Sequence, residues 1–443
     1  MQIPLKVIQS SGMVLRDDAK IESAPVSSDD FLKLAAGKRI FLLSVNLEGI
    51  GLSRRLSALG MKVAAFLDSR FAGQKRHGVD VIDPNQYFQM LDLNNDLLII
   101  CTKDRQWKRV FLERAANSGL QRYVNLFTPL DICRFFPTIE IEGKCNLQCK
   151  TCDMGLPSAN KGRGHMSHGL FTEVLSKMLT EIPLMNSLAL YTWGEPLLNP
   201  DIAKIVRSCR EHGVACEVST NLDFHKYLDE FLLAEPDQIV APCAGVGARY
   251  ERGRTGGSWD NYLAGLYRIA EIKRKHNLDY NVRIMYHLYN DNLYEDLDYM
   301  LQLSKELGFS LIPIVAHIFP GQVYQYAVNG QEIPEVMRQA SEHLIFSLDD
   351  QLAYCQTIKD SKCHIINAFP TVTWDAKVLH CCNMQRPLVG GGVDFRQTSL
   401  EDLIAMRNGS PFCTKCMNHG VHRFFDVNVK IDEESGDRRV VRL

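Results

Sequence analysis

The sequence predicts an α/β protein built around a partial barrel of six strand–helix units, with a smaller α/β domain before it and a small cysteine-bearing domain after it. Strand-like apolar runs alternate with helical patterns from about residue 136 to residue 315, and such alternation implies parallel strands joined by right-handed crossovers. A shorter strand–helix–strand pattern covers residues 38–102. Six cysteines lie from Cys355 to Cys416, beyond the last barrel unit.

We therefore expect three domains, over residues 1–130, 131–345 and 346–443, because 443 residues are too many for one ordinary core. The hydrophobic content of 46% and charged content of 23% are those of a soluble globular protein. A net charge of −2 gives no reason to expect nucleic acid or an anionic membrane as a partner. No apolar run approaches the ~18–20 residues that span a bilayer. The N-terminus (residues 1–6) lacks a secretion signal, so we expect a cytoplasmic location.

The cysteines indicate metal or redox chemistry. The chain has 14 of them, and a reducing cytosol does not sustain a disulfide framework, so clustered cysteines there are typical of metal sites. Cys145, Cys149 and Cys152 fall within eight residues. The scattered cysteines are expected to be buried small hydrophobes; they are Cys101, Cys133, Cys209, Cys216 and Cys243.

The N-terminal domain carries a degraded nucleotide-binding pattern. After its first strand only Gly49 remains of the G-x-G-x-x-G motif, and Asp68 stands near the position of a ribose-binding acid. The segments AAFLDSR (64–70) and HGVDVIDP (77–84) resemble the Rossmann-like N-terminal domain of sugar-modifying acyltransferases and nucleotide-sugar enzymes. The resemblance implies nucleotide or substrate binding, and a purely structural role stays open.

The six predicted barrel units place chemistry at the carboxyl ends of their strands. Helices are expected over residues 169–181, 200–212, 227–233, 259–276 and 293–307. The expected strands are Thr138–Ile141, Ser187–Tyr191, Ala215–Ser219, Gln238–Pro242, Asn281–Tyr286 and Ser310–Val315.

Cys145, Cys149 and Cys152 follow the first barrel strand directly. Three thiolates spaced four and three residues apart can bind three irons of a 4Fe–4S cube and leave the fourth iron open to another ligand. A zinc knuckle is the alternative. It would need a fourth ligand nearby, and no further Cys or His comes before His165.

A C-x3-C-x2-C motif after a first barrel strand resembles the radical S-adenosylmethionine (radical SAM) superfamily over roughly residues 136–320, although Thr151 replaces the aromatic residue often found before the third cysteine. The resemblance implies that the open iron binds the amino and carboxylate groups of AdoMet. It also implies that reductive cleavage yields a 5′-deoxyadenosyl radical, with an external electron donor such as flavodoxin or ferredoxin.

Two further motifs follow the second and third strands. Trp193-Gly194-Glu195-Pro196 resembles the family's G-G-E-P motif, which implies that this turn and the Glu195 carboxylate bind the methionine ammonium. The segment ending in Ser219-Thr220-Asn221 resembles the family's T-N-G motif, which implies hydrogen bonds from Ser219 and Asn221 to the ribose.

The C-terminal cysteines resemble the truncated auxiliary-cluster ("twitch") domain related to the SPASM domain. A Trp-Asp-Ala stretch (374–376) has Ala376 where that family usually has glycine, and it precedes Cys381 and Cys382, of which Cys381 fits the spacing better. The resemblance implies one auxiliary 4Fe–4S cluster, and structural zinc on the same thiolates is the alternative. The implied ligands are Cys363, Cys381, Cys413 and Cys416.

Substrate clues are fewer. The loop over residues 250–257 resembles that of a branch associated with polysaccharide or aminosugar pathways, and polar residues end the fifth and sixth strands. Cys243 ends the fourth strand, where a thiol facing the barrel could donate a hydrogen atom to a substrate radical, but strand alternation permits either face. The polar residues are Arg283, Tyr286, His287 and His317.

Three functions follow. The first, which we favour, is a radical SAM enzyme that epimerises, dehydrogenates or dehydrates a sugar or nucleotide sugar, with the N-terminal domain holding the nucleotide. The second is a peptide-modifying maturase, for which no winged-helix leader-binding module is evident. The third is a non-enzymatic zinc-binding scaffold.

Overall fold

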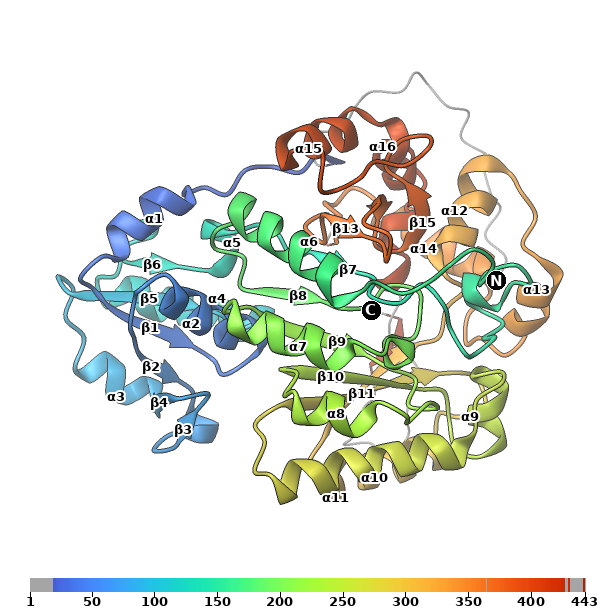
Figure 1. Cartoon of the computed structure of the whole chain (residues 1–443), viewed down its shortest axis with the longest axis horizontal. Helices are drawn as coiled ribbons and strands as arrows, with labels where there is room; N and C mark the ends of the chain where they lie inside the picture. Colours follow the sequence, from blue (N-terminus) through green and yellow to red (C-terminus); the bar gives the residue numbers. More distant parts are fainter. Residues whose placement is uncertain (1–18, 364, 427–428, 431–440, 443) are drawn as a thin grey trace.

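The computed structural model describes residues 19–363, 365–426, 429–430 and 441–442. Residues 1–6, in which the sequence predicts no secretion signal, lie outside the described residues. Two parallel sheets with covering helices form the molecule, and a mostly helical C-terminal segment lies along one side of the second sheet (Figure 1). Within the described part of the chain, no helix is long and apolar enough to cross a membrane.

The first sheet belongs to the N-terminal segment and has the strand order β3-β4-β2-β1-β5-β6, parallel except for the β3–β4 pair. Its apolar strands are buried on both faces, as parallel sheets require. Its strands are β1 (Arg39–Leu43), β2 (Val63–Leu67), β3 (Lys75–Arg76), β4 (Val79–Ile82), β5 (Asp96–Ile100) and β6 (Leu126–Phe127). Its helices are α1 (Ser28–Ala35), α2 (Leu47–Ala58), α3 (Pro84–Gln89), α4 (Arg105–Asn117) and α5 (Pro129–Ile132).

The second sheet contains the predicted barrel. Six parallel strands follow one another in chain order from β7 to β12, so the α/β partial-barrel prediction is confirmed. The strands are β7 (Thr138–Ile139), β8 (Ser187–Ala189), β9 (Ala215–Ser219), β10 (Gln238–Cys243), β11 (Asn281–Leu288) and β12 (Ser310–Val315). The covering helices are α6 (His168–Glu181), α7 (Ile202–Glu211), α8 (Leu228–Leu233), α9 (Ala248–Gly253), α10 (Trp259–Lys275) and α11 (Glu295–Leu307).

The C-terminal segment extends this same sheet. Strand β13 pairs in parallel with β7, and β14 and β15 continue as an antiparallel hairpin. Its strands are β13 (Thr371–Val372), β14 (Val378–Cys381) and β15 (Met384–Pro387), and a separate pair is formed by β16 (Val429–Lys430) and β17 (Val441–Arg442). Its helices are α12 (Pro320–Asn329), α13 (Glu335–Ser341), α14 (Leu348–Thr357), α15 (Leu400–Gly409), α16 (Pro411–Asn418) and the 3-10 turn η5 (Val421–Asp426).

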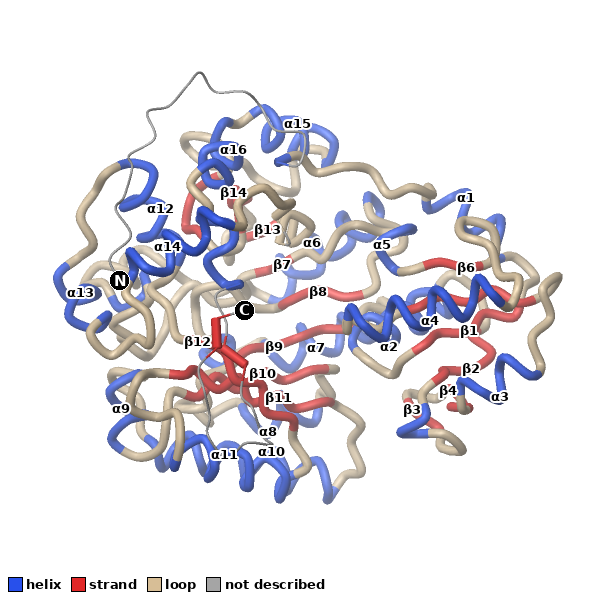
Figure 2. The backbone as a smooth tube through the Cα atoms, turned by 180° about the vertical axis from the view of Figure 1, so that it is seen from behind, coloured by secondary structure: helices blue, strands red, loops and turns tan. Residues whose placement is uncertain are grey.

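The N-terminal segment docks on the amino ends of the barrel strands. Figure 2 shows α2 between the two sheets, and a Cβ atom on Gly51 of α2 would lie 1.9 Å from the carbonyl oxygen of Asn186, just before β8. Arg54 pairs with Asp237, just before β10, at 2.6 Å. Arg76 pairs with Asp279, just before β11. The domain therefore closes the barrel end opposite to the loops that carry the cysteine motif.

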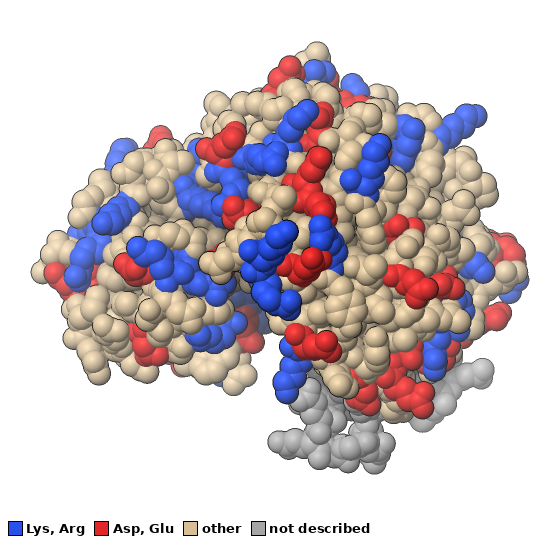
Figure 3. Space-filling model, turned by 60° about the horizontal axis from the view of Figure 1, so that its bottom comes forward, with Lys and Arg blue, Asp and Glu red and all other residues tan. Residues whose placement is uncertain are grey.

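A hollow of about 830 Å³ remains beside this junction, between the end of α2, the β3–β4 hairpin and the end of α7. It is visible from below as an indentation between the two lobes (Figure 3). Lys62, Lys75 and Arg210 are among its lining residues.

The residues of the predicted nucleotide-binding pattern in the N-terminal domain contact other residues of the same domain. Asp68 is 7% exposed. Its carboxylate accepts hydrogen bonds from the backbone N–H of Val45 at 3.1 Å and from the Arg70 guanidinium at 2.8 and 3.0 Å. A Cβ on Gly49 would lie 2.5 Å from the Ser44 carbonyl oxygen, so this glycine allows the helix to approach the strand closely. Asp68 thus stabilises the turn after β1.

Candidate functional site

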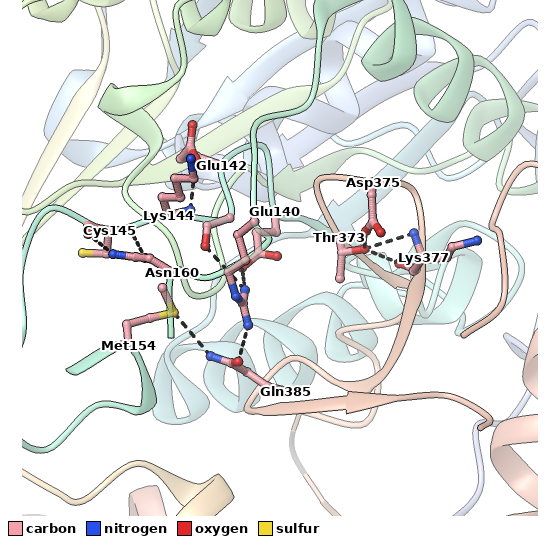
Figure 4. Close-up of polar contacts among 12 residues, drawn as sticks. Glu140, Glu142, Lys144, Cys145, Met154, Asn160, Thr373, Asp375, Lys377 and Gln385 are labelled. Atoms are coloured by element: carbon pink, nitrogen blue, oxygen red, sulfur yellow. Dashed lines mark hydrogen bonds and ion pairs between the residues drawn. The ribbon is translucent and has the colours of Figure 1, made fainter. Parts of the chain in front are cut away.

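The cysteine loop after β7 is held by local hydrogen bonds. The thiol sulfur of Cys145 accepts from the Leu147 N–H, and that of Cys152 accepts from the Met154 N–H, both at 3.4 Å. Asn160 clamps the loop from both sides, because its Oδ1 accepts from the Cys145 N–H at 3.0 Å and its Nδ2 donates to the Cys145 carbonyl at 2.9 Å (Figure 4). Burial raises the pKa of Cys145 to about 12, so ligation must displace its proton.

The turn after β8 packs on this loop, backbone against backbone. A Cβ on Gly194 would lie 1.9 Å from the carbonyl oxygen of Glu142, and the Glu195 N–H donates to the Lys144 carbonyl at 2.7 Å. Only glycine fits at position 194 because any side chain would collide with backbone. The second predicted motif therefore lies directly against the first.

Glu195 joins the second motif to the third. One carboxylate oxygen accepts from the Leu197 N–H at 2.9 Å and the other from the Asn221 N–H at 2.8 Å. Burial raises the pKa of Glu195 to about 7, partly offset by these N–H donors. The side chain predicted to bind an ammonium group thus also fixes the loop after β9. The Thr220 side chain also hydrogen-bonds this carboxylate, which leaves one lone pair that a ligand ammonium can use.

Asn221 and Ser219 complete the assembly on the β9 side. The Asn221 side chain donates to Asn146 Oδ1 at 2.9 Å, and its Nδ2 lies 3.9 Å from the Cys145 sulfur. Ser219 ends β9 half-buried. Three loops far apart in sequence therefore meet at one point through Glu195 and Asn221, at the carboxyl ends of their strands.

Trp193 forms an apolar wall of this site. Its side chain is buried with Met154 against Cys145 and Cys152, and its ring centroid lies 4.5 Å from that of Phe319. The indole N–H is buried without a hydrogen-bond partner among the described residues. Trp193 therefore shields the cysteine loop from water.

Arg254 also belongs to the site, and the sequence analysis did not identify it. It follows α9 in the 250–257 loop, which pairs with the cysteine loop through the Gln148 N–H and the Thr255 carbonyl at 2.8 Å. Its guanidinium hydrogen-bonds the Cys149 thiol and lies 3.5 Å from His287 Nδ1. Burial alone would lower the pKa of Arg254, but the neighbouring Cys149 raises it above its usual range. The only signal in the sequence was the position of this loop after the fourth strand.

Cys243 lies on the outer face of the barrel, so the structure does not support its predicted role as a hydrogen-atom donor. In the strand register it pairs with Tyr286, and both side chains are fully buried toward the helices. Its thiol donates to the Gly245 carbonyl at 3.2 Å. Pro242 and Met285, the preceding residues of the two strands, occupy the inner face. Tyr286 is likewise turned outward and donates to the Asn292 carbonyl at 2.9 Å.

The inner face of the barrel carries a chain of hydrogen bonds between polar side chains. Tyr191 donates to Glu217 at 2.5 Å, Gln238 donates to the other oxygen of Glu217, and Arg283 donates to Gln238 at 3.4 Å. This chain crosses neighbouring strands β8 to β11 below the cysteine loop.

Two histidines lie nearer the carboxyl ends of β11 and β12. His287 is beside Arg254, and His317 Nδ1 lies 2.8 Å from Gln351 Oε1. Burial lowers the pKa of His317 to about 4 and that of His287 well below its usual range. Both imidazoles are therefore neutral at physiological pH and can exchange hydrogen bonds with uncharged polar groups.

The four predicted C-terminal thiols converge on one small cavity of about 40 Å³. The cavity is otherwise lined mainly by apolar side chains such as Met384 and Phe412. Cys382 and Cys355 are not among its lining residues. The converging thiols are Cys363, Cys381, Cys413 and Cys416.

Two polar groups accompany these thiols. His380 Nε2 lies 3.4 Å from the Cys413 sulfur. Arg407 lines the cavity, is 4% exposed and donates from Nε to the His380 carbonyl at 3.3 Å. At the preceding turn Ala376 has φ 62°, in the left-handed region that favours glycine.

The donor sets fit iron–sulfur clusters in chemistry and grouping: three thiols on one loop beside Arg254, and four thiols around one cavity beside Arg407. In the described residues no group of three or more His, Cys, Asp and Glu side chains could hold a single metal ion. This does not count against a cluster, because a 4Fe–4S cube takes each thiolate on a separate iron atom.

No protein-family model matches this chain, and no curated protein matches it. Solved structures do. SuiB from Streptococcus suis bound to S-adenosylmethionine shares 14% identity, covering 67% of this chain and 69% of its own with a TM-score of 0.40. The anSMEcpe structure with bound AdoMet shares 16% identity, covering 69% and 86% with a TM-score of 0.41.

A third solved structure is BtrN in complex with AdoMet and 2-DOIA. It shares 14% identity, covering 70% of this chain and all (100%) of that chain, with a TM-score of 0.37. These three structures, each with bound AdoMet, are thus similar to this chain over 67–70% of its length at 14–16% identity.

Proposed function

We propose that this chain is a radical SAM enzyme in which Cys145, Cys149 and Cys152 bind a 4Fe–4S cluster. The observation that carries the proposal is the meeting of three motif loops through Glu195, which accepts the Asn221 N–H while its own N–H donates to Lys144 of the cysteine loop. When bound, the cluster and AdoMet supply one-electron cleavage of AdoMet and abstraction of a hydrogen atom from a substrate carbon.

Different residues of this chain bind different parts of AdoMet. The remaining lone pair of the Glu195 carboxylate accepts a charge-assisted hydrogen bond from the methionine ammonium. Ser219 and Asn221, at the end of β9, bind the ribose hydroxyls. Trp193, packed over Cys145 and Cys152, excludes water from the cysteine loop. In the C-terminal segment Cys363, Cys381, Cys413 and Cys416 bind a second, fully ligated cluster.

The substrate is a sugar or a nucleotide sugar, and its reacting part enters the barrel from the carboxyl ends of the strands. Neutral His287 and His317, together with Arg283, provide hydrogen-bonding groups on that side and on the inner wall, which suits a ligand rich in hydroxyls. Because Cys243 is turned outward, the arrangement favours dehydrogenation or dehydration over epimerisation. The N-terminal domain lies at the opposite end of the barrel, so in this proposal it does not bind the nucleotide of the substrate.

The test is anaerobic reconstitution with iron and sulfide. Wild-type protein should bind about eight irons per chain, two cubes' worth, and should form 5′-deoxyadenosine from AdoMet under a strong reductant. Replacing Cys145, Cys149 and Cys152 together by Ala should leave about four irons and abolish this product. Cys243→Ala, at a cysteine outside both sets, is the matched control and should retain both. Full iron content in the triple variant would contradict the assignment.

A further inference from the structure

Each thiol set is accompanied by one arginine without a carboxylate partner. Arg407 on α15 is 4% exposed. Its guanidinium carbon lies 5.5 Å from the centre of the Phe369 ring, and its Nη1 is buried without a hydrogen-bond partner among the described residues. It lines the cavity on which the four C-terminal thiols converge.

Arg254 stands in the same relation to the barrel thiols. Its Nε is buried without a hydrogen-bond partner among the described residues, while the rest of the guanidinium meets the Cys149 thiol and the neutral His287 ring. In the part of the chain that the structure describes, neither Arg254 nor Arg407 forms an ion pair with a carboxylate.

Two other shielded arginines are each compensated by a carboxylate. Arg54 and Asp237 pair at 2.6 Å, with side chains 16% and 0% exposed. Arg163 pairs with the buried Glu140 at 3.5 Å. A buried cation is costly unless an anion compensates it, so an arginine that lacks a carboxylate and points at thiols calls for another source of negative charge.

We propose that Arg254 and Arg407 are the counter-cations of two thiolate-ligated iron–sulfur clusters, each lying beside one thiol set so that its charge compensates the negative charge that appears when the thiols bind iron. This inference rests on the proposed function. Groups outside the ligand set tune both the affinity and the reduction potential of a metal site. Both arginines are positioning residues: they act on the cluster and not on substrate.

Two consequences distinguish this role from a structural one. In the iron-free protein neither arginine forms an ion pair with a carboxylate, and Arg254 has only a longer-range interaction with Glu195. Replacing either arginine by Met, which is neutral and of similar length, should therefore leave the iron-free melting temperature unchanged or raise it. In the iron-loaded protein the same change removes a favourable charge. The difference in melting temperature between loaded and iron-free protein should therefore shrink.

The decisive measurement is the reduction potential of each cluster, followed by electron paramagnetic resonance during a potentiometric titration of the full-length protein. A nearby cation favours the reduced cluster, which carries more negative charge. Arg407→Met should lower the reduced-to-oxidised ratio of the C-terminal cluster about tenfold at a fixed potential, a shift of 59 mV to more negative values for one electron, and should leave the barrel cluster unchanged. Arg254→Met should do the converse. Arg407→Lys and Arg254→Lys, which keep the charge, should restore most of each shift.

Arg55→Met is the matched control. Arg55 is also largely shielded but donates to the Pro183 and His212 carbonyls, at 2.6 and 3.2 Å, in the junction with the N-terminal domain. It should lower the melting temperature of loaded and iron-free protein alike and shift neither potential. Loaded variants with wild-type potentials and an iron-free form less stable than wild type would overturn this inference alone. Wild-type protein that binds no iron would overturn the proposed function and this inference with it.

Discussion

Glu140 and Arg163 connect the barrel to the C-terminal segment side chain by side chain. Glu140 is fully buried and pairs with Arg163 at 3.5 Å. Arg163 also donates to Gln385 of β15, whose own amide donates to the sulfur of Met154 at 3.4 Å (Figure 4). One buried carboxyl thus supports the contact between the cysteine loop and the C-terminal segment.

This carboxyl makes stability depend on pH. Burial raises the pKa of Glu140 to about 7, against the opposing effect of Arg163, from the ordinary value of 4.5. A carboxyl with a raised pKa binds its proton more tightly in the folded state, so its contribution is fully present below about pH 4.5 and is lost as pH rises through about 7. The contribution of Glu140 to the free energy of unfolding should therefore fall between pH 5 and 7 by up to ~1.4 kcal/mol per pH unit.

Denaturant titration of the iron-free protein across this range checks the prediction. Glu140→Gln, which cannot titrate, should lack this contribution, so the free energy of unfolding of wild type minus that of the variant should fall from pH 5 to pH 7. Two parallel curves would show that Glu140 does not titrate in this window.

At this scale the sequence predicted which motif residues lie together better than it predicted their other neighbours. The cysteines and the residues of the three motifs are ordered along the chain, so their grouping followed from strand order. Arg254 meets Cys149, and Asn160 meets Cys145, only after distant loops come together. For Cys243 the alternation of a strand is visible in the sequence, but which of its two faces meets the helices is decided by the neighbouring strands.

At the scale of elements, α2 shows how a single residue fixes a helix against a sheet. Gly51 lets the helix touch the backbone before β8. The barrel strands and most of their helices were predictable because each combines an apolar run with a clear period. Strands β13 to β15, of two to four residues, were not, since they exist only by pairing with β7 and with one another.

Gly51→Ala tests this docking. Alanine favours a helix over glycine by up to ~1 kcal/mol, but here its Cβ would collide with a carbonyl oxygen, and overpacking of this kind typically costs ~1–3 kcal/mol. The free energy of unfolding should therefore fall. Gly169→Ala in α6 is the control, because a Cβ there meets nothing within 4 Å, and it should be neutral or stabilising. Chemical denaturation of both variants suffices, and equal effects would refute the steric argument.

At the scale of the whole molecule, the N-terminal domain and the barrel form one body. They share a continuous buried core, and the Arg54–Asp237 pair closes their junction. Removal of residues 1–130 would expose that core, so we expect the truncated chain not to fold. This deletion therefore cannot test whether the N-terminal domain binds substrate.

A double-mutant cycle measures the junction in the intact chain. Arg54→Met and Asp237→Asn should each lower the free energy of unfolding by ~3–5 kcal/mol, because each leaves a buried group unpaired, and the double variant should lose less than the sum. Thermal unfolding should remain a single transition in every variant. The exposed Arg268–Asp229 pair, with side chains 40% and 50% exposed, is the control and should contribute ~1 kcal/mol or less. Additive losses, or two separate transitions, would mean that the domains are independent.

The pairing of β13 with β7 has a consequence for biosynthesis. The N–H groups of Phe136, Thr138 and Glu140 donate to carbonyls of residues 367, 370 and 372, which a ribosome adds about 230 residues later. At ~5–20 residues per second this takes about ten to fifty seconds. For that time the strand leading into the cysteine loop has a bare edge, which other chains can pair with. The nascent protein is thus most exposed to misassembly just before its last quarter emerges. Lower growth temperatures, or chaperones that cover strand edges, should raise its yield.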